Sequence, residues 1–493
     1  MPPRPNIWLI MTDQQRADTI GALGNPVIQT PTLDRLCAEG TAFTSAYCAS
    51  PVCVASRCSL VLGEYPHQTG CTANTPMPLE RRSMMERLQE AGYQTHGVGK
   101  MHFSPRPRFL WGFESRDYSE EGASGDDDFV RYLAQQGYGH IVAPHGERSE
   151  YYYIPQPSQL PAERHHTAWC ADRSIQFLQS RDRSRPFFLW TSFIKPHPPF
   201  ENPVPWNRLY RAVEMPLPFV PPDYQELWTY WTRFQNRYKY RDQGVDWNLI
   251  RTMRAAYYGA ISFIDYQVGR VLAELERQGV LDQTLILFTS DHGEMLGDYH
   301  AYGKRSMLDP AVRVPLVVRF PDRFPAGRRV EAPVSLIDLL PTILAAAGIS
   351  EELPPHGLDL AVAADGDQRR RSGVLAQFSH RERGLYLWCT EEFKYIYSAA
   401  DQKEWLLFRR PGLPEDRNLA GNPAFEGTLR AMRSELITLL REDGYTEPLD
   451  GDHWRTYERL PIVPTTPDAA QLFQDLRSVA DRFPPGYRPR VNP

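Results

Sequence analysis

The stretch Ile7-Trp8-Leu9-Ile10-Met11, followed by Thr12-Asp13-Gln14-Gln15, decides which fold the sequence predicts. An unbroken apolar run that ends abruptly in polar residues is typical of a strand buried on both faces of a sheet. Similar short runs recur along the chain, at residues 94–98, 187–193, 285–289 and 315–320. Amphipathic stretches that favour helices lie near residues 162–182, 251–278 and 335–347. This alternation predicts an α/β fold in which helices sandwich a large, mostly parallel sheet.

The pattern changes at about residue 371, where short runs typical of antiparallel strands begin, at residues 374–378, 385–389, 394–398 and 405–408. An amphipathic helix is predicted at 426–441, and the tail beyond residue 449 is rich in proline and charge. We therefore predict a catalytic α/β domain over residues 1–370 and a small α+β domain with an extended tail over residues 371–493. An aromatic-rich insertion at residues 202–246 is too apolar for a solvated linker. It could line a pocket, pack at an oligomer interface or belong to the core.

The composition excludes several classes of partner. Lysine and arginine total 55 against 60 for aspartate and glutamate, which gives a formal net charge of −5, and no basic tract occurs. We therefore expect no nucleic-acid partner. No apolar stretch is long enough to span a membrane, and the run at residues 7–11 is too short for the core of a signal peptide. Seven cysteines, an odd number without metal-binding spacing, favour reduced thiols and a cytoplasmic protein with no membrane partner.

A second stretch, Cys53-Val54-Ala55-Ser56-Arg57, followed by Gly63, indicates where chemistry takes place. It lies between a Ser-Pro turn and an apolar stretch, and it predicts a helix over residues 54–62 with the cysteine at its first turn. Free backbone N–H groups and the positive end of the helix dipole converge there, and Arg57 adds a guanidinium one turn on. These features predict a site for an oxyanion. The alternative is a buried cysteine near a turn, with Arg57 in a surface ion pair.

Two polar pairs follow two of the predicted strands. Asp13 and Gln14 come directly after the first strand, and Ser290-Asp291-His292-Gly293-Glu294 follows the strand at residues 285–289. Because the carboxyl ends of parallel strands meet at one sheet edge, both pairs can face the same ligand. Carboxylate, amide and imidazole groups together suit a divalent cation, whereas an isolated aspartate after a strand is more often a helix cap.

Further cations and histidines follow the other strands. Lys100-Met101-His102 comes after the strand at residues 94–98, and Lys195-Pro196-His197-Pro198-Pro199 comes after the strand at residues 187–193. The prolines fix the backbone, so that His197 is presented rigidly, as a proton donor requires. Lys304 lies twelve residues after His292. A surface lysine with a lone histidine, and a proline-rich surface loop, are the alternatives for these segments.

Taken together, these segments resemble the type I sulfatases of the alkaline-phosphatase-like superfamily. The family signature is Cys-x-Pro-x-Arg followed by Gly, and its cysteine is oxidised after translation to formylglycine; this sequence has Ala55 in place of the proline. The resemblance implies one divalent ion, held by Asp13, Gln14, Asp291, His292 and an oxygen of the modified Cys53. The ion is usually Ca²⁺. Gln14 stands where many members carry a second aspartate, and His292 where some carry asparagine, which makes Mn²⁺ an alternative.

The resemblance also implies roles for the remaining residues. Residue 53 as the aldehyde hydrate is the nucleophile, and Arg57, Lys100 and Lys304 stabilise the transferring anion. His197 protonates the leaving alcohol, and His102 helps to break down the covalent intermediate. Asn74 is a weaker match to a polar substrate contact. The implied partners are a small sulfate ester and, during maturation, the formylglycine-generating enzyme.

Two rival functions stay open at this point. Phosphonate monoester and phosphodiester hydrolases of the same superfamily share the Asp-Gln and Asp-His pairs and the formylglycine, but do not carry Gly-Lys-x-His. A non-catalytic binder of sulfate esters would result if Ala55 left Cys53 unmodified. The alcohol part of the ester and the oligomeric state, including a homo-oligomer, are left undecided by the sequence.

Overall fold

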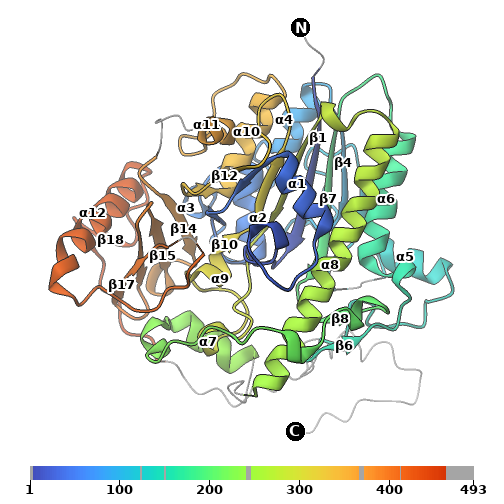
Figure 1. The fold of residues 1–493 in the computed structure, drawn as a ribbon. Coiled ribbons are helices and arrows are strands. Elements are labelled where there is room, and N and C mark those ends of the chain that lie inside the picture. The colour runs from blue at the N-terminus through green and yellow to red at the C-terminus, as the bar shows by residue number, and fades with distance from the viewer. Residues whose placement is uncertain are drawn as a thin grey trace.

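The structure, a computed structural model, describes residues 4–122, 125–148, 152–239, 246–365, 371–410 and 412–461. An eight-stranded sheet lies at its centre (Figure 1), in the order β12-β2-β11-β9-β1-β7-β4-β5. The strands of this sheet are β1 (Asn6–Asp13), β2 (Thr41–Phe43), β4 (Gln94–Gly99), β5 (Ser115–Tyr118), β7 (Phe187–Pro196), β9 (Thr284–Ser290), β11 (Leu316–Arg319) and β12 (Arg328–Val330). The five strands from β9 to β5 pair in parallel, whereas β11 is antiparallel to both β9 and β2. The prediction of a mostly parallel α/β sheet is confirmed.

Helices cover both faces of the sheet because successive side chains of a strand point to opposite sides. Ile7, Leu9 and Met11 pack with one group of helices: α2 (Cys53–Leu62), α4 (Met84–Glu90) and α10 (Leu339–Ala346). Trp8 and Ile10 pack with the other group: α1 (Pro31–Glu39), α6 (His166–Ser180) and α8 (Trp247–Arg277). Shorter elements connect these layers: α3 (Pro66–Thr69), α5 (Asp128–Gln135), α7 (Tyr230–Lys239), α9 (Asp309–Val312), α11 (Leu360–Asp365), β3 (Ala46–Tyr47), β6 (Gln156–Pro157), β8 (Glu201–Asn202), β10 (Arg313–Val314) and β13 (Val334–Ser335). None of the helices in the described part of the chain has the length and apolarity that a membrane crossing requires.

A small antiparallel sheet with one long helix forms the C-terminal part, drawn in orange and red at one side of Figure 1. Its elements are β14 (Val374–Phe378), β15 (Leu385–Cys389), β16 (Phe393–Ser398), β17 (Lys403–Phe408) and α12 (Glu426–Glu442). A two-stranded ribbon follows, β18 (Leu449–Asp450) with β19 (His453–Trp454). The predicted small α+β unit is confirmed, and the predicted tail from residue 462 onward lies outside the described residues.

The two parts are joined by backbone and charged contacts. The N–H groups of Gln377 and Ser379 donate to the carbonyls of Ala49 (2.8 Å) and Thr72 (2.7 Å). The buried Lys394 ammonium pairs with Asp309 at 2.7 Å and also with Glu415. The small sheet is therefore bound directly to the loop before α2, to the residues after α3 and to the start of α9.

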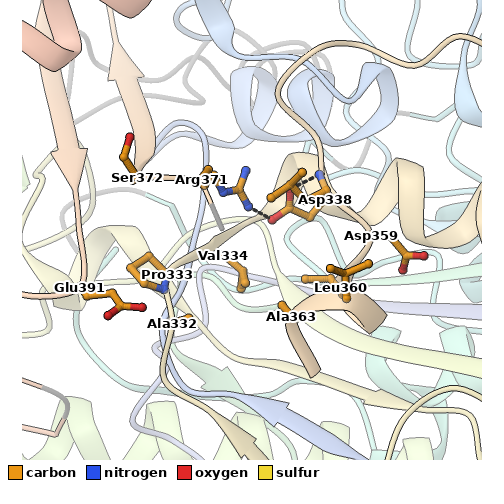
Figure 2. A pocket seen from close by; sticks show the side chains of 13 residues that line it. Ala332, Pro333, Val334, Asp338, Asp359, Leu360, Ala363, Arg371, Ser372 and Glu391 are labelled. Carbon is orange, nitrogen blue, oxygen red and sulfur yellow. Dashed lines mark hydrogen bonds and ion pairs between the residues drawn. The ribbon is translucent and has the colours of Figure 1, made fainter. Parts of the chain in front are cut away.

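A small cavity marks the start of this joint (Figure 2). It has a volume of about 40 Å³ and is lined mainly by apolar residues between Ala332 and Ala363. At its edge Arg371 pairs with the buried carboxylate of Asp338, which also accepts from the N–H groups of Ser335 (2.8 Å) and Leu358 (2.9 Å). We propose that the boundary between the two predicted domains lies here, next to residues 366–370, which are outside the described part.

The aromatic insertion packs within the chain. Trp206 stacks on Phe263 of α8 with ring centroids 4.9 Å apart, and Trp231 meets Phe378 of β14 edge-on at 4.8 Å. Of the three alternatives (pocket lining, an oligomer interface and core packing), these two ring contacts support core packing. The side chain of Tyr238, in the same insertion, lies outside the described residues.

Candidate active site

Cys53 is the first residue of helix α2. The helix begins there because Val52 is extended, with φ −157°, and it ends at Gly63, whose positive φ of 70° suits a residue without a Cβ. All ten residues of α2 are buried, and Cys53 is 2% exposed. The N–H of Val54 donates to Asn74 Oδ1 at 3.2 Å, so Asn74 borders the first turn of the helix.

The tips of several strands converge on the Cys53 sulfur. Asp13 ends β1, and Asp291 and His292 follow β9, the strand beside it. The sulfur lies 3.2 Å from His292 Nε2 and 3.7 Å from Asp13 Oδ1. One ligand atom from each of Asp13, Cys53, Asp291 and His292 lies within 4.8 Å of the others, and all four residues are buried. The structure thus brings these predicted ligands together.

Arg57 contacts several of these residues through its guanidinium group. Its guanidinium is fully buried and donates through Nε to Asp291 Oδ2 at 2.8 Å, and through Nη1 to Ser192 Oγ at 2.9 Å and to the carbonyl of Lys100. Nη2 forms an ion pair with Asp13 Oδ2 at 3.7 Å, and within the described residues it has no hydrogen-bond partner. Its N–H groups therefore have capacity for a further acceptor.

The ligand atoms fit a divalent cation. The contact of His292 Nδ1 with the carbonyl of Gly293 at 3.0 Å places the ring hydrogen on Nδ1, which leaves the lone pair of Nε2 facing the cluster. Gln14 Oε1, His292 Nε2 and Cys53 Sγ all contact the Lys304 ammonium, at 3.0, 3.1 and 2.9 Å. These three atoms thus already surround a positive charge. Asp13, Gln14, Asp291, His292 and an oxygen carried by residue 53 would hold the ion.

The cations around Cys53 outweigh its burial. Burial and the Asp13 carboxylate raise the pKa of the thiol, but Lys100 and Lys304 lower it more, to about 7. Burial also raises the pKa of Asp13, yet Lys100, His197 and Lys304 hold it well below its usual range. Negative charge is therefore favoured at this point of the molecule.

The two predicted histidines lie on the side of Lys100. His197 Nδ1 contacts the carbonyl of Pro198 at 2.6 Å, which leaves Nε2 free to face the site, 3.7 Å from Glu121 Oε1. Burial lowers the pKa of His197 well below its usual value. Burial and Lys100 lower the pKa of His102 to about 4. Both rings are therefore neutral at neutral pH while the site holds no anion.

Sequence reasoning missed the acidic residues that border the site. Glu121 pairs with Lys100 and accepts from Arg148 at 2.9 Å, and Glu120 accepts from the N–H of His102 at 2.7 Å. Neither glutamate lies in a motif or a periodic segment, so no local signal could have identified them. Glu294 does stand in the segment after β9, but its contact with Gln14 depends on chain far away in the sequence.

Comparisons with known proteins agree with this geometry. The family model described as Sulfatase matches residues 5–349, and a model described as N-sulphoglucosamine sulphohydrolase, C-terminal, matches residues 297–442. An arylsulfatase of Clostridium perfringens is 29% identical over 90% of this chain and 96% of its own. The multifunctional alkaline phosphatase superfamily protein PehA of Trinickia caryophylli is 31% identical, over 87% and 93%. The solved structure of a phosphonate monoester hydrolase from Silicibacter pomeroyi has a TM-score of 0.75 at 25% identity, over 93% of this chain and all of that one.

Proposed function

This chain belongs to the sulfatase family, and on that premise we propose that it hydrolyses sulfate monoesters through a formylglycine made from Cys53. The observation that carries the proposal is the position of the Cys53 side chain. It lies at a helix N-terminus between Lys100 and Lys304, at 4.0 and 2.9 Å, beside the candidate metal ligands. A tetrahedral anion placed above it would meet cations on several sides.

Each residue of the site has a role in this reaction. In this proposal the Nη2 group of Arg57 and the ammonium groups of Lys100 and Lys304 bind the oxygens of the sulfate group. The bound cation would neutralise charge on the transferring group and lower the pKa of a hydroxyl next to it. Oxidised to the aldehyde and hydrated, residue 53 supplies one hydroxyl as the nucleophile for sulfur and a second hydroxyl whose deprotonation releases sulfate.

Two proton transfers complete the cycle. His197 Nε2 is placed to protonate the leaving alcohol oxygen, because an ester anion beside the ring adds the negative charge that favours its protonated form. His102, which is neutral because its pKa is about 4, is suited to take the proton of the second hydroxyl. The nucleophilic hydroxyl gives up its own proton to solvent, and the proton gained at His102 returns to His197 through solvent. Each turnover thus releases sulfate, the alcohol and one proton, and water restores the hydrate.

The decisive experiment is mass spectrometry of the peptide that contains residue 53, from protein made with and without the formylglycine-generating enzyme. We expect the aldehyde after maturation, and turnover of an aryl sulfate in proportion to its content. Cys53→Ala and Cys53→Ser serve as matched controls, and both should be inactive while folded. A third variant, Ala55→Pro, restores the family signature within the first turn of α2, where a proline costs no intrahelical hydrogen bond. It should raise the aldehyde fraction. Only thiol after maturation, with turnover absent, would favour a non-catalytic binder.

A phosphonate monoester hydrolase is the second candidate, since the solved phosphonate monoester hydrolase from Silicibacter pomeroyi is similar to this chain. Lys100 and His102 favour the sulfate ester instead, because they belong to the Gly-Lys-x-His segment that resembles the sulfatases and that the phosphonate hydrolases do not carry. In this structure they put a second lysine and a neutral histidine near residue 53. Specificity constants for an aryl sulfate and an aryl phosphonate with the same leaving group separate the two. A strong preference for the phosphonate would overturn the proposal.

The metal is tested in the same assay, with Ca²⁺ expected to support turnover and Mn²⁺ as the alternative.

A further inference from the structure

Glu294 is a fully buried carboxylate one residue beyond the glycine that follows His292. Its Oε2 accepts from Gln14 Nε2 and from the Tyr153 hydroxyl at 3.1 Å. Its Oε1 accepts from the N–H groups of Leu296 at 3.0 Å and of Gly303. Within the described residues none of these partners is a cation. Four donors, and no counter-ion among them, hold this carboxylate in place in the interior.

The orientation of the Gln14 amide follows from its two neighbours. A carboxylate only accepts hydrogen bonds, so Glu294 requires the NH₂ group on its own side. An ammonium only donates, so Lys304 requires the amide oxygen on the other side, where Oε1 lies 3.0 Å from its Nζ. Both neighbours select the same orientation, and it turns the amide oxygen toward the candidate metal ligands.

We propose that Glu294 is a positioning residue of the metal site, whose carboxylate fixes the Gln14 amide so that its oxygen faces the cation. The pairing also gives a physical reason for glutamine rather than glutamate at position 14. A glutamate there would face Glu294 at hydrogen-bond distance, and two buried negative charges repel. This inference rests on the metal site of the proposed function but does not depend on the ester.

The exchange of the two groups gives a sharp test. In Glu294→Gln, the new amide oxygen can still accept from Leu296 and Gly303, but its NH₂ group then faces the NH₂ group of Gln14. Gln14 must turn its oxygen away from the cation to relieve this contact. In the double variant Gln14→Glu with Glu294→Gln, the hydrogen bond forms again in the opposite sense, and a carboxylate oxygen faces the cation.

Metal affinity is measured by calorimetry with CaCl₂ and with MnCl₂ on the full chain after chelator treatment. Glu294→Gln is expected to weaken binding by about 10- to 100-fold, as is usual when a group that orients a ligand is lost. In the Gln14→Glu background the same substitution should tighten binding, because it removes the repulsion between two carboxylates. Equal weakening of metal binding in both backgrounds would show that Glu294 acts only through its charge. Unchanged metal affinity in the wild-type background would show that Glu294 does not orient Gln14. Either result overturns the proposal.

Thermal unfolding in chelator distinguishes positioning from a general structural role. We expect Glu294→Gln to change metal affinity far more than it changes the unfolding temperature of the metal-free protein. If this single variant fails to fold, the comparison of Gln14→Glu with the double variant still decides the sign of the coupling. Because no ester is involved, a positive result stands even if sulfate esters are not the substrate, and a negative one leaves the sulfatase proposal intact.

Discussion

Arg57 has two functions in the structure that can be separated by mutation. Its Nε pairs with the buried carboxylate of Asp291 at 2.8 Å, and its Nη2, 3.7 Å from Asp13 Oδ2, is the atom that we propose contacts the sulfate group. Arg57→Met removes both, and because Asp291 is fully buried, the loss of its partner is expected to cost about 3–5 kcal/mol of folding free energy. Arg57→Lys keeps a charge for Asp291 but has no planar fork. Its cost in stability should be smaller, about 1.5–3 kcal/mol for the lost charge-assisted hydrogen bond.

The two variants should therefore differ in stability, but both should lose activity, because both lack the Nη2 group. The specificity constant for an aryl sulfate should fall by about 10²- to 10³-fold in Arg57→Lys, the usual effect of losing one donor to the developing charge. Urea unfolding and steady-state kinetics on fully converted protein measure the two effects. If Arg57→Lys stayed within about threefold of the wild-type kcat/KM, the assignment of Nη2 to the substrate would be wrong.

Other contacts in the active site and in the small sheet lead to four more predictions. Glu121→Gln should tighten the binding of inorganic sulfate, because the carboxylate that pairs with Lys100 no longer competes with the anion; weaker binding in calorimetry would contradict this. Chelation of divalent ions should lower the unfolding temperature, and a cation at about 100 times its Kd should restore about 2.7 kcal/mol; an unfolding temperature insensitive to chelator would argue against the site. Lys394→Met leaves the carboxylates of Asp309 and Glu415 buried without their shared cation, and denaturant unfolding should show a loss of about 3–5 kcal/mol. Burial and Lys100 lower the pKa of His102 from 6.5 to about 4, so between these pH values the unfolded chain binds a proton that the folded chain does not. Stability should therefore fall by about 3 kcal/mol as the pH drops through this window, and His102→Gln should flatten that part of the stability curve.

The central strands and the residues at their tips could be predicted from the sequence. Apolar runs such as Ile7 to Met11 have to be buried on both faces, and the polar residues that follow them then meet at one sheet edge. The helix that begins at Cys53 was predictable for a similar reason, since an apolar stretch follows a turn and ends at a glycine. The juxtaposition of Asp13, Cys53, Asp291 and His292 follows from these local features together with the parallel arrangement of the strands.

Features that depend on contacts between distant segments could not be predicted. The run at residues 315–320 has the same apolar pattern in either direction, so its antiparallel pairing with β9 is set by the path of the chain. The packing of the aromatic insertion could not be predicted because the partner of Trp231, Phe378, lies in the small sheet, far away in the sequence. Likewise, an isolated glutamate such as Glu121 or Glu294 carries no sign of its partner, since its contacts come from other parts of the fold.

The complete burial of Cys53 to Arg57 has a consequence for the order of events during biosynthesis. Under the proposed function, the oxidising enzyme would have to bind this pentapeptide before helix α2 is enclosed by α3, α4 and α10. The proposed oxidation of Cys53 therefore competes kinetically with folding, and it has to take place before the segment is buried. A cell in which folding is faster than oxidation would accumulate well-folded molecules that carry a permanent thiol and cannot be repaired without unfolding.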